Sequence, residues 1–239
     1  MDITLTIIIP FYNEEATIVK LLDAVLEVNV ANYIFLVDDG STDNSKSLID
    51  KYIDNSKIFY FYKENTGKGS CLNHVKNKIT TSHYIMQDAD LEYNPKDLSR
   101  MFEISKQNSE SLVLGSREIE FSLRENKYRI FRFGAKFISI IFYLVNHYKV
   151  TDIASGYLLV PTKFLHSIEL DEQGFGIEIE IISKFIKSGG LIIETPISYT
   201  ARSIEEGKKI TYKDGLRILF LVFKFKFLDE SNSKFNKNK

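Results

Sequence analysis

Short apolar runs alternate with segments of helical periodicity through the first half of the chain. In 14–28, for example, Ile18, Leu21 and Val25 recur at helical spacing and share one face. Such an alternation predicts an α/β fold with a mostly parallel sheet that helices cover on both faces. The apolar runs that we interpret as strands lie at 5–10, 33–41, 57–62, 83–90 and 111–117.

The second half of the chain has a less regular pattern. It predicts a long apolar helix over about 128–145, short strands at 157–161 and 191–197, and a last helix over about 212–228. We expect one domain over residues 1–228. The polar tail 229–239 has the composition of a disordered segment.

Polar side chains gather where three of the predicted strands end. Residues 12–14 follow the first strand, Asp38 and Asp39 follow the second, and Asp88 and Asp90 follow the fourth. In parallel sheets, ligands bind beyond the carboxyl ends of the strands. The three clusters therefore predict one binding site at that edge.

Asp88 and Asp90 form the most informative of these clusters. Residues two apart point to the same side of a straight strand, where two carboxylates repel each other unless a cation lies between them. Mg²⁺ takes one or two carboxylates together with substrate phosphates, which suits a diphosphate leaving group. Glu92 is a third candidate ligand. The alternative is a solvated acidic turn.

Several further residues are candidates for ligand contacts, each with a structural alternative. Asp38 suits hydrogen bonds to a base or a ribose, or else the cap of a helix. Lys68 brings a charge to a Gly-Lys-Gly turn that a ligand can approach closely. Arg202 and Lys208 lie in a polar loop that could close over phosphates or stay solvated, and Arg117 is a cation at a strand end.

Composition and missing motifs exclude several classes of function. The formal net charge is −1, which disfavours nucleic-acid binding, and the single cysteine, Cys71, allows no internal disulfide and fits a reducing cytoplasm. We expect no signal peptide and no membrane-spanning helix. The glycine signatures of dehydrogenases and P-loop kinases are absent, as are the serine and cysteine hydrolase arrangements.

Taken together, the motifs resemble those of family 2 glycosyltransferases with the GT-A fold. In the first half the matching segments are IIPFYNEE, VDDGSTDNS, NTGKGSCLN, QDADLEYNP and GSR. The second half is similar to the branch of dolichyl-phosphate and polyprenyl-phosphate mannosyl- and glucosyltransferases, through TDIASGYLLV, FGIEIEI and PISYTARSIEEGKKITYKDGLR. The resemblance covers roughly residues 3–228. It implies a nucleotide-sugar half over about 1–117 and an acceptor half over about 118–228.

The resemblance also implies roles for individual residues. The residues that would bind a UDP- or GDP-linked sugar are Pro10, Tyr12, Glu14, Asp38, Lys68 and Asp88. The residues that would hold Mg²⁺ or Mn²⁺ are Asp88, Asp90 and Glu92. The residues that would hold phosphates of the donor or the acceptor are Arg117, Arg202 and Lys208.

This chain departs from the family pattern at two places. Glu92 stands where many relatives carry glutamine. In the motif D-x-x-S-G-F-R, Asp152 and the following Ser-Gly match, but Tyr157 and Leu158 replace the aromatic-arginine pair.

The family implies inversion at the anomeric carbon by direct displacement. A polyprenyl phosphate acceptor is already a nucleophile at neutral pH, because a phosphate monoester has a second pKa near 6. A sugar hydroxyl acceptor needs a general base, for which Asp152 is the candidate. A catalytically inert nucleotide-sugar-binding protein is the third hypothesis, and the retention of Asp88 and Asp90 speaks against it.

The last predicted helix bears on where the enzyme works. Lys213, Arg217 and Lys224 lie on one face of a helix that is otherwise largely apolar. This pattern is typical of a helix in a membrane interface, or of a helix that packs on the core. We expect a cytoplasmic protein in peripheral contact with the membrane.

Overall fold

The computed structural model describes residues 3–120, 124–125, 129–202 and 212–228. The strands are β1 (Leu5–Phe11), β2 (Tyr33–Asp38), β3 (Ile58–Tyr62), β4 (His83–Met86), β5 (Leu112–Ser116), β6 (Arg124–Glu125), β7 (Leu158–Pro161), β8 (Ile192–Pro196) and β9 (Tyr199–Thr200). The helices are α1 (Ile18–Val28), α2 (Ser45–Ile53), α3 (Lys68–Val75), the 3₁₀ turn η1 (Lys76–Lys78), α4 (Asp97–Gln107), α5 (Arg129–Asn146), α6 (Thr162–His166), α7 (Ile177–Lys187), α8 (Tyr212–Phe223) and its π-helical continuation η3 (Lys224–Leu228).

The central sheet has seven strands in the order β3-β2-β1-β4-β7-β5-β8. All neighbouring strands are parallel except β7, which runs antiparallel to β4 and to β5. This arrangement confirms the predicted α/β class with a mostly parallel sheet. Because β7 runs the other way, the residues that precede it lie at the edge where β4 and β5 end.

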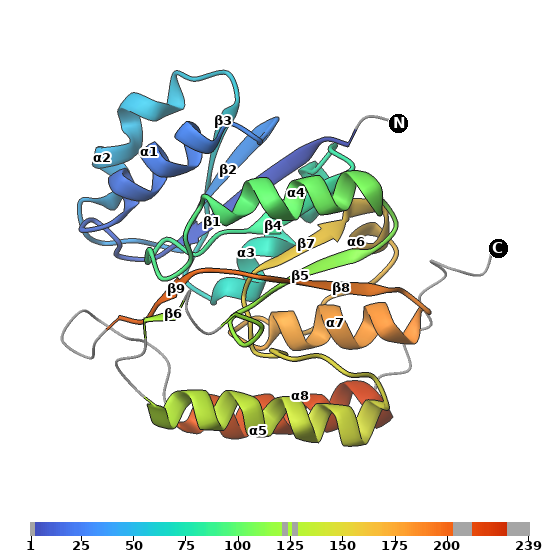
Figure 1. Ribbon diagram of the computed structural model, residues 1–239. Coiled ribbons are helices and arrows are strands. Elements are labelled where there is room, and N and C mark those ends of the chain that lie inside the picture. The colour runs from blue at the N-terminus through green and yellow to red at the C-terminus, as the bar shows by residue number, and fades with distance from the viewer. Residues whose placement is uncertain (1–2, 121–123, 126–128, 203–211, 229–239) are drawn as a thin grey trace.

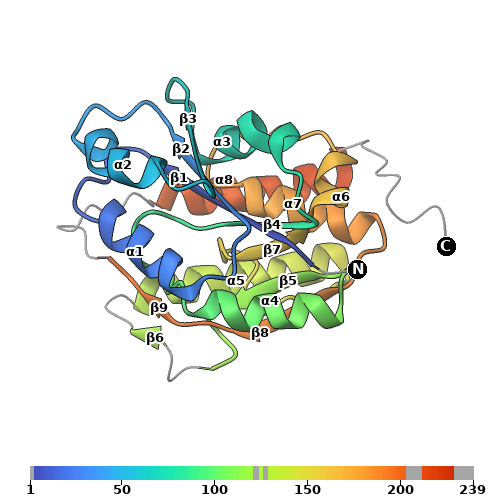
Figure 2. The same ribbon diagram turned by 90° about the horizontal axis from the view of Figure 1, so that it is seen from above.

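Helices cover both faces of the sheet (Figures 1 and 2). Along β1, Ile7 and Ile9 face the core under α1 and α4, whereas Ile8 faces the core under α3 and α7. Side chains alternate between the faces of a strand, so a strand buried on both faces reads as a continuous apolar run. Helices α5 and α8 pack against each other beyond α7, as an outer layer.

Most of the predicted elements are confirmed, and some boundaries differ. The predicted helix over 14–28 begins only at Ile18, because residues 14–17 form a turn in which the backbone N–H groups of Thr17 and Ile18 both donate to the carbonyl of Glu14. In the second half, α5, β7, β8 and α8 with η3 match the predicted segments. The sequence pattern did not predict α7 or the antiparallel direction of β7.

None of the helices in the described residues is both long enough and apolar enough to cross a membrane.

Candidate active site

Asp88 follows β4 and forms an ion pair with a buried lysine. The Nζ atom of Lys68, the first residue of α3, lies 2.6 Å from Oδ1 of Asp88 and 2.8 Å from Oε1 of Glu178. Burial by itself would lower the pKa of Lys68, but the two carboxylates raise it above its ordinary value. The Lys68 ammonium is therefore a fixed positive charge beside Asp88.

Asp90 lies in a strongly negative environment. Its Oδ1 atom accepts a hydrogen bond from the backbone N–H of Glu92 at 3.0 Å. Burial, together with the charges of Asp88 and Glu92, raises the pKa of Asp90 to about 7. A cation beside this carboxylate would favour its charged form.

Arg202 connects the acidic pair to the loop after β1. Its Nε donates to the backbone carbonyl of Asp90 at 2.8 Å, and its Nη2 lies 2.9 Å from Oε2 of Glu14. Glu92 accepts hydrogen bonds from the backbone N–H of Arg202 at 2.8 Å and from the hydroxyl of Tyr199 at 2.6 Å. Both carboxylate oxygens of Glu92 are thus engaged with the segment around β9.

Asp38 and Asp39 organise the loops at the end of β2. The carboxylate of Asp38 accepts hydrogen bonds from the hydroxyl of Tyr60 at 2.9 Å and from the backbone of the next turn at 2.7 Å. The carboxylate of Asp39 accepts from the backbone N–H groups of Thr66 at 3.1 Å and Gly67 at 2.8 Å. Asp39 therefore fixes the turn from which Lys68 projects.

Pro10 and Tyr12 lie where β1 and β2 end side by side. Pro10 is buried and pairs in register with Val37, and the next pair in the register joins residue 11 to Asp38. Tyr12, just beyond the strand, is 38% exposed. The structure thus brings Tyr12 and Asp38 to one sheet edge, as the strand-end pattern predicted, and Pro10 lies in the last part of β1 beside them.

Arg117 and Asp152 pair with each other. The Nε and Nη2 atoms of Arg117 lie 2.6 Å and 2.8 Å from the two carboxylate oxygens of Asp152, and both side chains are buried. The guanidinium group also lies 4.9 Å from the ring centre of Tyr199. Asp152 was predicted as a candidate base and Arg117 as a phosphate ligand, and this geometry makes each the charge partner of the other.

The sequence profile described as "Glycosyl transferase family 2" matches residues 6–166, which is more than half of the chain. The chain belongs to glycosyltransferase family 2. It is 27% identical to an undecaprenyl-phosphate mannosyltransferase from Micrococcus luteus, over 84% of this chain and 85% of that protein. It is 28% identical to a dolichol-phosphate mannosyltransferase from Pyrococcus furiosus, over 85% of this chain and 58% of that protein.

The fold is also that of solved glycosyltransferases. Glucosyl-3-phosphoglycerate synthase from Mycobacterium tuberculosis, crystallised with Mn²⁺, UDP and glucosyl-3-phosphoglycerate, superposes with a TM-score of 0.72 at 17% identity. The match covers 95% of this chain and 81% of that one. This glycosyltransferase therefore has the GT-A fold that its motifs predicted.

The acidic pair of this glycosyltransferase suits a divalent cation whose other ligands come from the substrate. Within the described part of the chain, no group of three or more His, Cys, Asp or Glu side chains is arranged to hold a metal ion. Two carboxylates are enough protein ligands for a divalent cation when phosphates and water complete its coordination shell. Burial, and after it the charges of Asp88 and Glu92, raise the pKa of Asp90, and a cation would offset those charges. Asp88 and Asp90 fit such a site, and Glu92 stays a predicted ligand.

Three residues of the site were not predicted from the sequence. Glu178 contacts Lys68, and Tyr199 links Glu92 to Arg117 as described above. The hydroxyl of Tyr93 accepts a hydrogen bond from the backbone N–H of Gly156 at 2.8 Å, which joins the loop before β7 to the acidic segment. Tyr93 lies three residues after Asp90, and this proximity to the acidic pair is the one feature of the sequence that could have indicated its place in the site. Lys208 lies outside the described residues.

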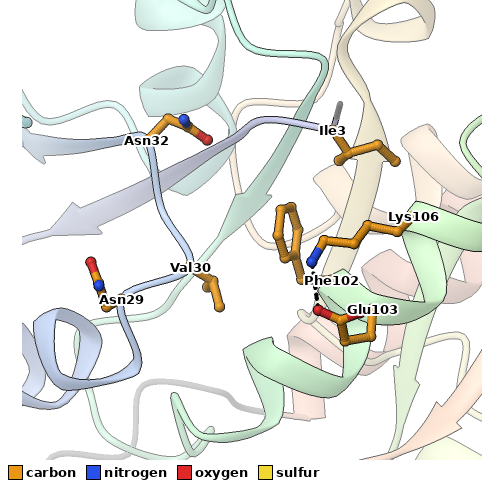
Figure 3. A pocket seen from close by; sticks show the side chains of 7 residues that line it. All are labelled: Ile3, Asn29, Val30, Asn32, Phe102, Glu103 and Lys106. Atoms are coloured by element: carbon orange, nitrogen blue, oxygen red, sulfur yellow. Dashed lines mark hydrogen bonds and ion pairs between the residues drawn. The ribbon is translucent and has the colours of Figure 1, made fainter. Parts of the chain in front are cut away.

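A hollow of about 640 Å³ lies away from this site (Figure 3). It is lined by Ile3, Asn29, Val30, Asn32, Phe102, Glu103 and Lys106. Ile3 precedes β1 and Asn32 precedes β2, so the hollow lies at the amino ends of these strands, opposite the acidic pair. Its two charged side chains, Glu103 and Lys106, pair with each other at 2.6 Å. We assign it no role in sugar transfer.

Proposed function

We propose that this glycosyltransferase moves a hexose from a nucleotide-diphosphate sugar to a polyprenyl phosphate at a membrane surface. The observation that carries the proposal is the bidentate pairing of Asp152 with Arg117, which occupies the candidate general base. A phosphate acceptor needs no such base. The names of the mannosyltransferases that match most of this chain support the same acceptor.

The donor would lie along the ends of β1, β2 and β4. Pro10, Tyr12 and Asp38 would contact the nucleoside, and Lys68 and Arg202 would face its diphosphate. Asp88 and Asp90 would hold Mg²⁺ or Mn²⁺, which would offset the charge that develops on the leaving diphosphate. The sugar would then lie toward the loop before β7.

The proposed reaction is a single displacement. An oxygen of the lipid phosphate attacks the anomeric carbon while the bond from that carbon to the donor diphosphate breaks. The nucleoside diphosphate leaves with the bonding electrons, and the anomeric configuration inverts. At neutral pH the acceptor phosphate is largely dianionic, so no proton has to be removed. Arg117, held by Asp152, would be a cation that orients the acceptor phosphate.

An exposed apolar face on the outer helix layer supports a membrane location. We call it the outer face, and its residues are Phe133, Phe137, Ile140 and Leu144 of α5 and Leu216, Phe220, Phe223 and Phe227 of α8 and η3. In each helix the spacing is i, i+4, i+7 and i+11, which places the four side chains in one stripe. The two helices lie side by side at the surface (Figure 1).

The same helices carry an excess of positive charge. Residues 129–146 and 212–228 contain seven lysines and arginines and one aspartate, whereas the whole chain has a formal net charge of −1. Of the predicted basic face of the last helix, Arg217 lies 2.8 Å from Glu172 and Lys224 lies 3.9 Å from Asp171. An apolar stripe on a basic helix pair fits the interface of an anionic bilayer.

The double substitution Phe137→Ser/Phe220→Ser should weaken binding to vesicles that contain anionic lipid by at least about tenfold. Each phenylalanine contributes on the order of 1.5–3 kcal/mol when it is fully buried in an apolar environment. Co-flotation with vesicles measures the effect. The control is Phe59→Ser/Tyr62→Ser, which removes two exposed aromatic residues from the edge strand β3. Equal flotation of both variants and the unaltered chain would contradict the membrane role of the outer face.

The proposed function is tested by incubating the protein with a panel of UDP- and GDP-hexoses. Each donor is offered with vesicles that contain polyprenyl phosphate, with and without Mg²⁺ or Mn²⁺. We expect a labelled lipid product from a particular donor, formed only when both the metal and the lipid phosphate are present. Transfer to soluble glycans but never to lipid phosphate would overturn the proposal in favour of the hydroxyl-acceptor alternative.

A further inference from the structure

Lys68 lies between two carboxylates that belong to different parts of the chain. Asp88 follows β4, whereas Glu178 is the second residue of α7, more than 85 positions later. The side chains of Lys68 and Glu178 are 7% and 9% exposed, and that of Asp88 is 22% exposed. The side of this trio that faces solvent is therefore the Asp88 side.

We propose that Glu178 is a positioning residue that shares the Lys68 ammonium with Asp88 and so controls how readily Asp88 accepts a divalent cation. The inference rests on the proposed function in one respect, the assignment of the metal to Asp88 and Asp90. Neither the sequence motifs nor the proposed reaction assigns a role to Glu178.

Charge balance gives the physical reason. Lys68 contributes one positive charge next to the metal position, and a cation repels an incoming divalent cation. With Glu178 in place, the ammonium is neutralised from the side away from the metal, and Asp88 keeps most of its negative charge. Without the charge of Glu178, Asp88 would be the sole counter-ion of Lys68 in this trio. The metal would then have to displace the ammonium.

The local packing leaves the ammonium little room to move elsewhere. A Cβ atom at Gly156 would lie 3.1 Å from Nζ of Lys68 and 3.2 Å from Oδ2 of Asp88, so the loop before β7 packs closely against both side chains. The start of α3 is also tied to the segment before α7, because the backbone N–H of Ser70 donates to the carbonyl of Gln173 at 3.0 Å. Lys68 and Glu178 are thus held as one unit.

An ammonium group has three N–H donors. Lys68 contacts two carboxylates, so a donor directed at neither of them would be offered to an oxygen of the donor diphosphate. Glu178 would then keep Lys68 in place when Asp88 transfers its interaction from the ammonium to the metal. Lys68 and Glu178 would thus act first in binding of the metal and then in binding of the phosphate.

The test is a titration of the full chain with Mn²⁺ alone, in which electron paramagnetic resonance measures the free ion. We expect Glu178→Gln to weaken Mn²⁺ binding about tenfold and Lys68→Met to strengthen it by a similar factor. In the Lys68→Met background, Glu178→Gln should change the affinity by less than about twofold. A neighbour that acts through Lys68 loses its effect when Lys68 is absent, so this double-mutant cycle separates positioning from direct attraction.

Glu180→Gln is the matched control. Glu180 lies on the same helix, is fully buried, and pairs with Lys184 at 2.7 Å rather than with Lys68. It should leave the Mn²⁺ affinity unchanged, and thermal unfolding reports any loss of fold in each variant. An equal effect of Glu178→Gln in both backgrounds, or no effect in either, would overturn the proposal.

Whether the metal binds at Asp88 and Asp90 is tested separately from the role of Glu178. If the unaltered chain binds Mn²⁺ and Asp90→Asn abolishes that binding, the assignment holds and the cycle decides the role of Glu178. If the unaltered chain binds no Mn²⁺ either alone or with UDP or GDP present, or binds it independently of Asp90, the metal assignment fails and the role of Glu178 fails with it.

Discussion

We expect Asp90→Asn to lower the rate of sugar transfer by about a thousandfold while the protein stays folded. The substitution keeps the shape of the side chain and its hydrogen bond from the backbone of Glu92, but it removes one of the two charges that would hold the metal. Loss of one preorganised electrostatic group at a reacting centre commonly costs a hundredfold to a thousandfold. Initial-rate measurements at saturating Mn²⁺ give the effect.

The same variant should be more stable than the unaltered chain when metal is absent. Asp90 has a folded-state pKa of about 7, above the value of about 3.9 expected in an unfolded chain. Its ionisation therefore destabilises the fold progressively as the pH rises from about 4 to 7. Asp90→Asn should raise the melting temperature at pH 8 and have little effect at pH 4.

Asp54→Asn is the control for this prediction, because Asp54 is exposed at the end of α2, away from the strand ends that form the site. It should change neither the rate of sugar transfer nor the melting temperature at pH 8. A fully active Asp90→Asn variant would remove Asp90 from the metal site. A variant that is inactive but clearly less stable at pH 8 would contradict the electrostatic description of the acidic pair.

Asp152→Asn should destabilise the protein by about 3 kcal/mol, because it leaves the buried Arg117 without its charge partner. Removing one member of a buried ion pair typically costs about 3–5 kcal/mol, since the remaining charge is desolvated and uncompensated. Chemical denaturation measures the change. The matched double variant Arg117→Met/Asp152→Asn should regain part of the lost stability, because no unpaired charge remains.

A general base would behave differently. If Asp152 abstracted a proton from a sugar hydroxyl, Asp152→Asn would abolish transfer even in the fraction of the variant that stays folded. That result would contradict the pairing role assigned here and would favour a hydroxyl acceptor. Partial transfer to lipid phosphate by the folded fraction of the variant is the result consistent with our account.

The sequence predicted the first half of the fold well, because its strands are buried on both faces and its helices are amphipathic. Helix α7, in contrast, was not predicted from the sequence pattern. Its first residues read Ile-Glu-Ile-Glu-Ile, a period of two that favours a strand. In the structure this segment is a buried helix, in which Glu178 pairs with Lys68 and Glu180 with Lys184. The Glu178–Lys68 pair joins residues that are far apart in the sequence, so local periodicity cannot indicate it.

Part of the candidate site could also be predicted from the sequence. Asp38, Asp88 and Asp90 were found because they end apolar strands, and parallel topology brings such ends together. The partner of each charge was not predictable. Arg117 and Asp152 are 35 residues apart and meet because β7 runs antiparallel beside β5. The sequence pattern does not indicate that direction, so the two residues were predicted as separate functional groups.

The most direct test of the account compares two acceptors that differ by one group, polyprenyl phosphate and the corresponding polyprenol. Both are embedded in the same anionic vesicles with Mn²⁺ and the preferred nucleotide sugar, and the labelled sugar recovered in the lipid fraction is measured. Our account predicts transfer to polyprenyl phosphate and none to polyprenol, because the phosphate is itself the nucleophile and Asp152, the candidate base for a hydroxyl acceptor, is paired with Arg117. Equal transfer to polyprenol, or transfer to neither lipid while a soluble glycan is modified, would contradict it.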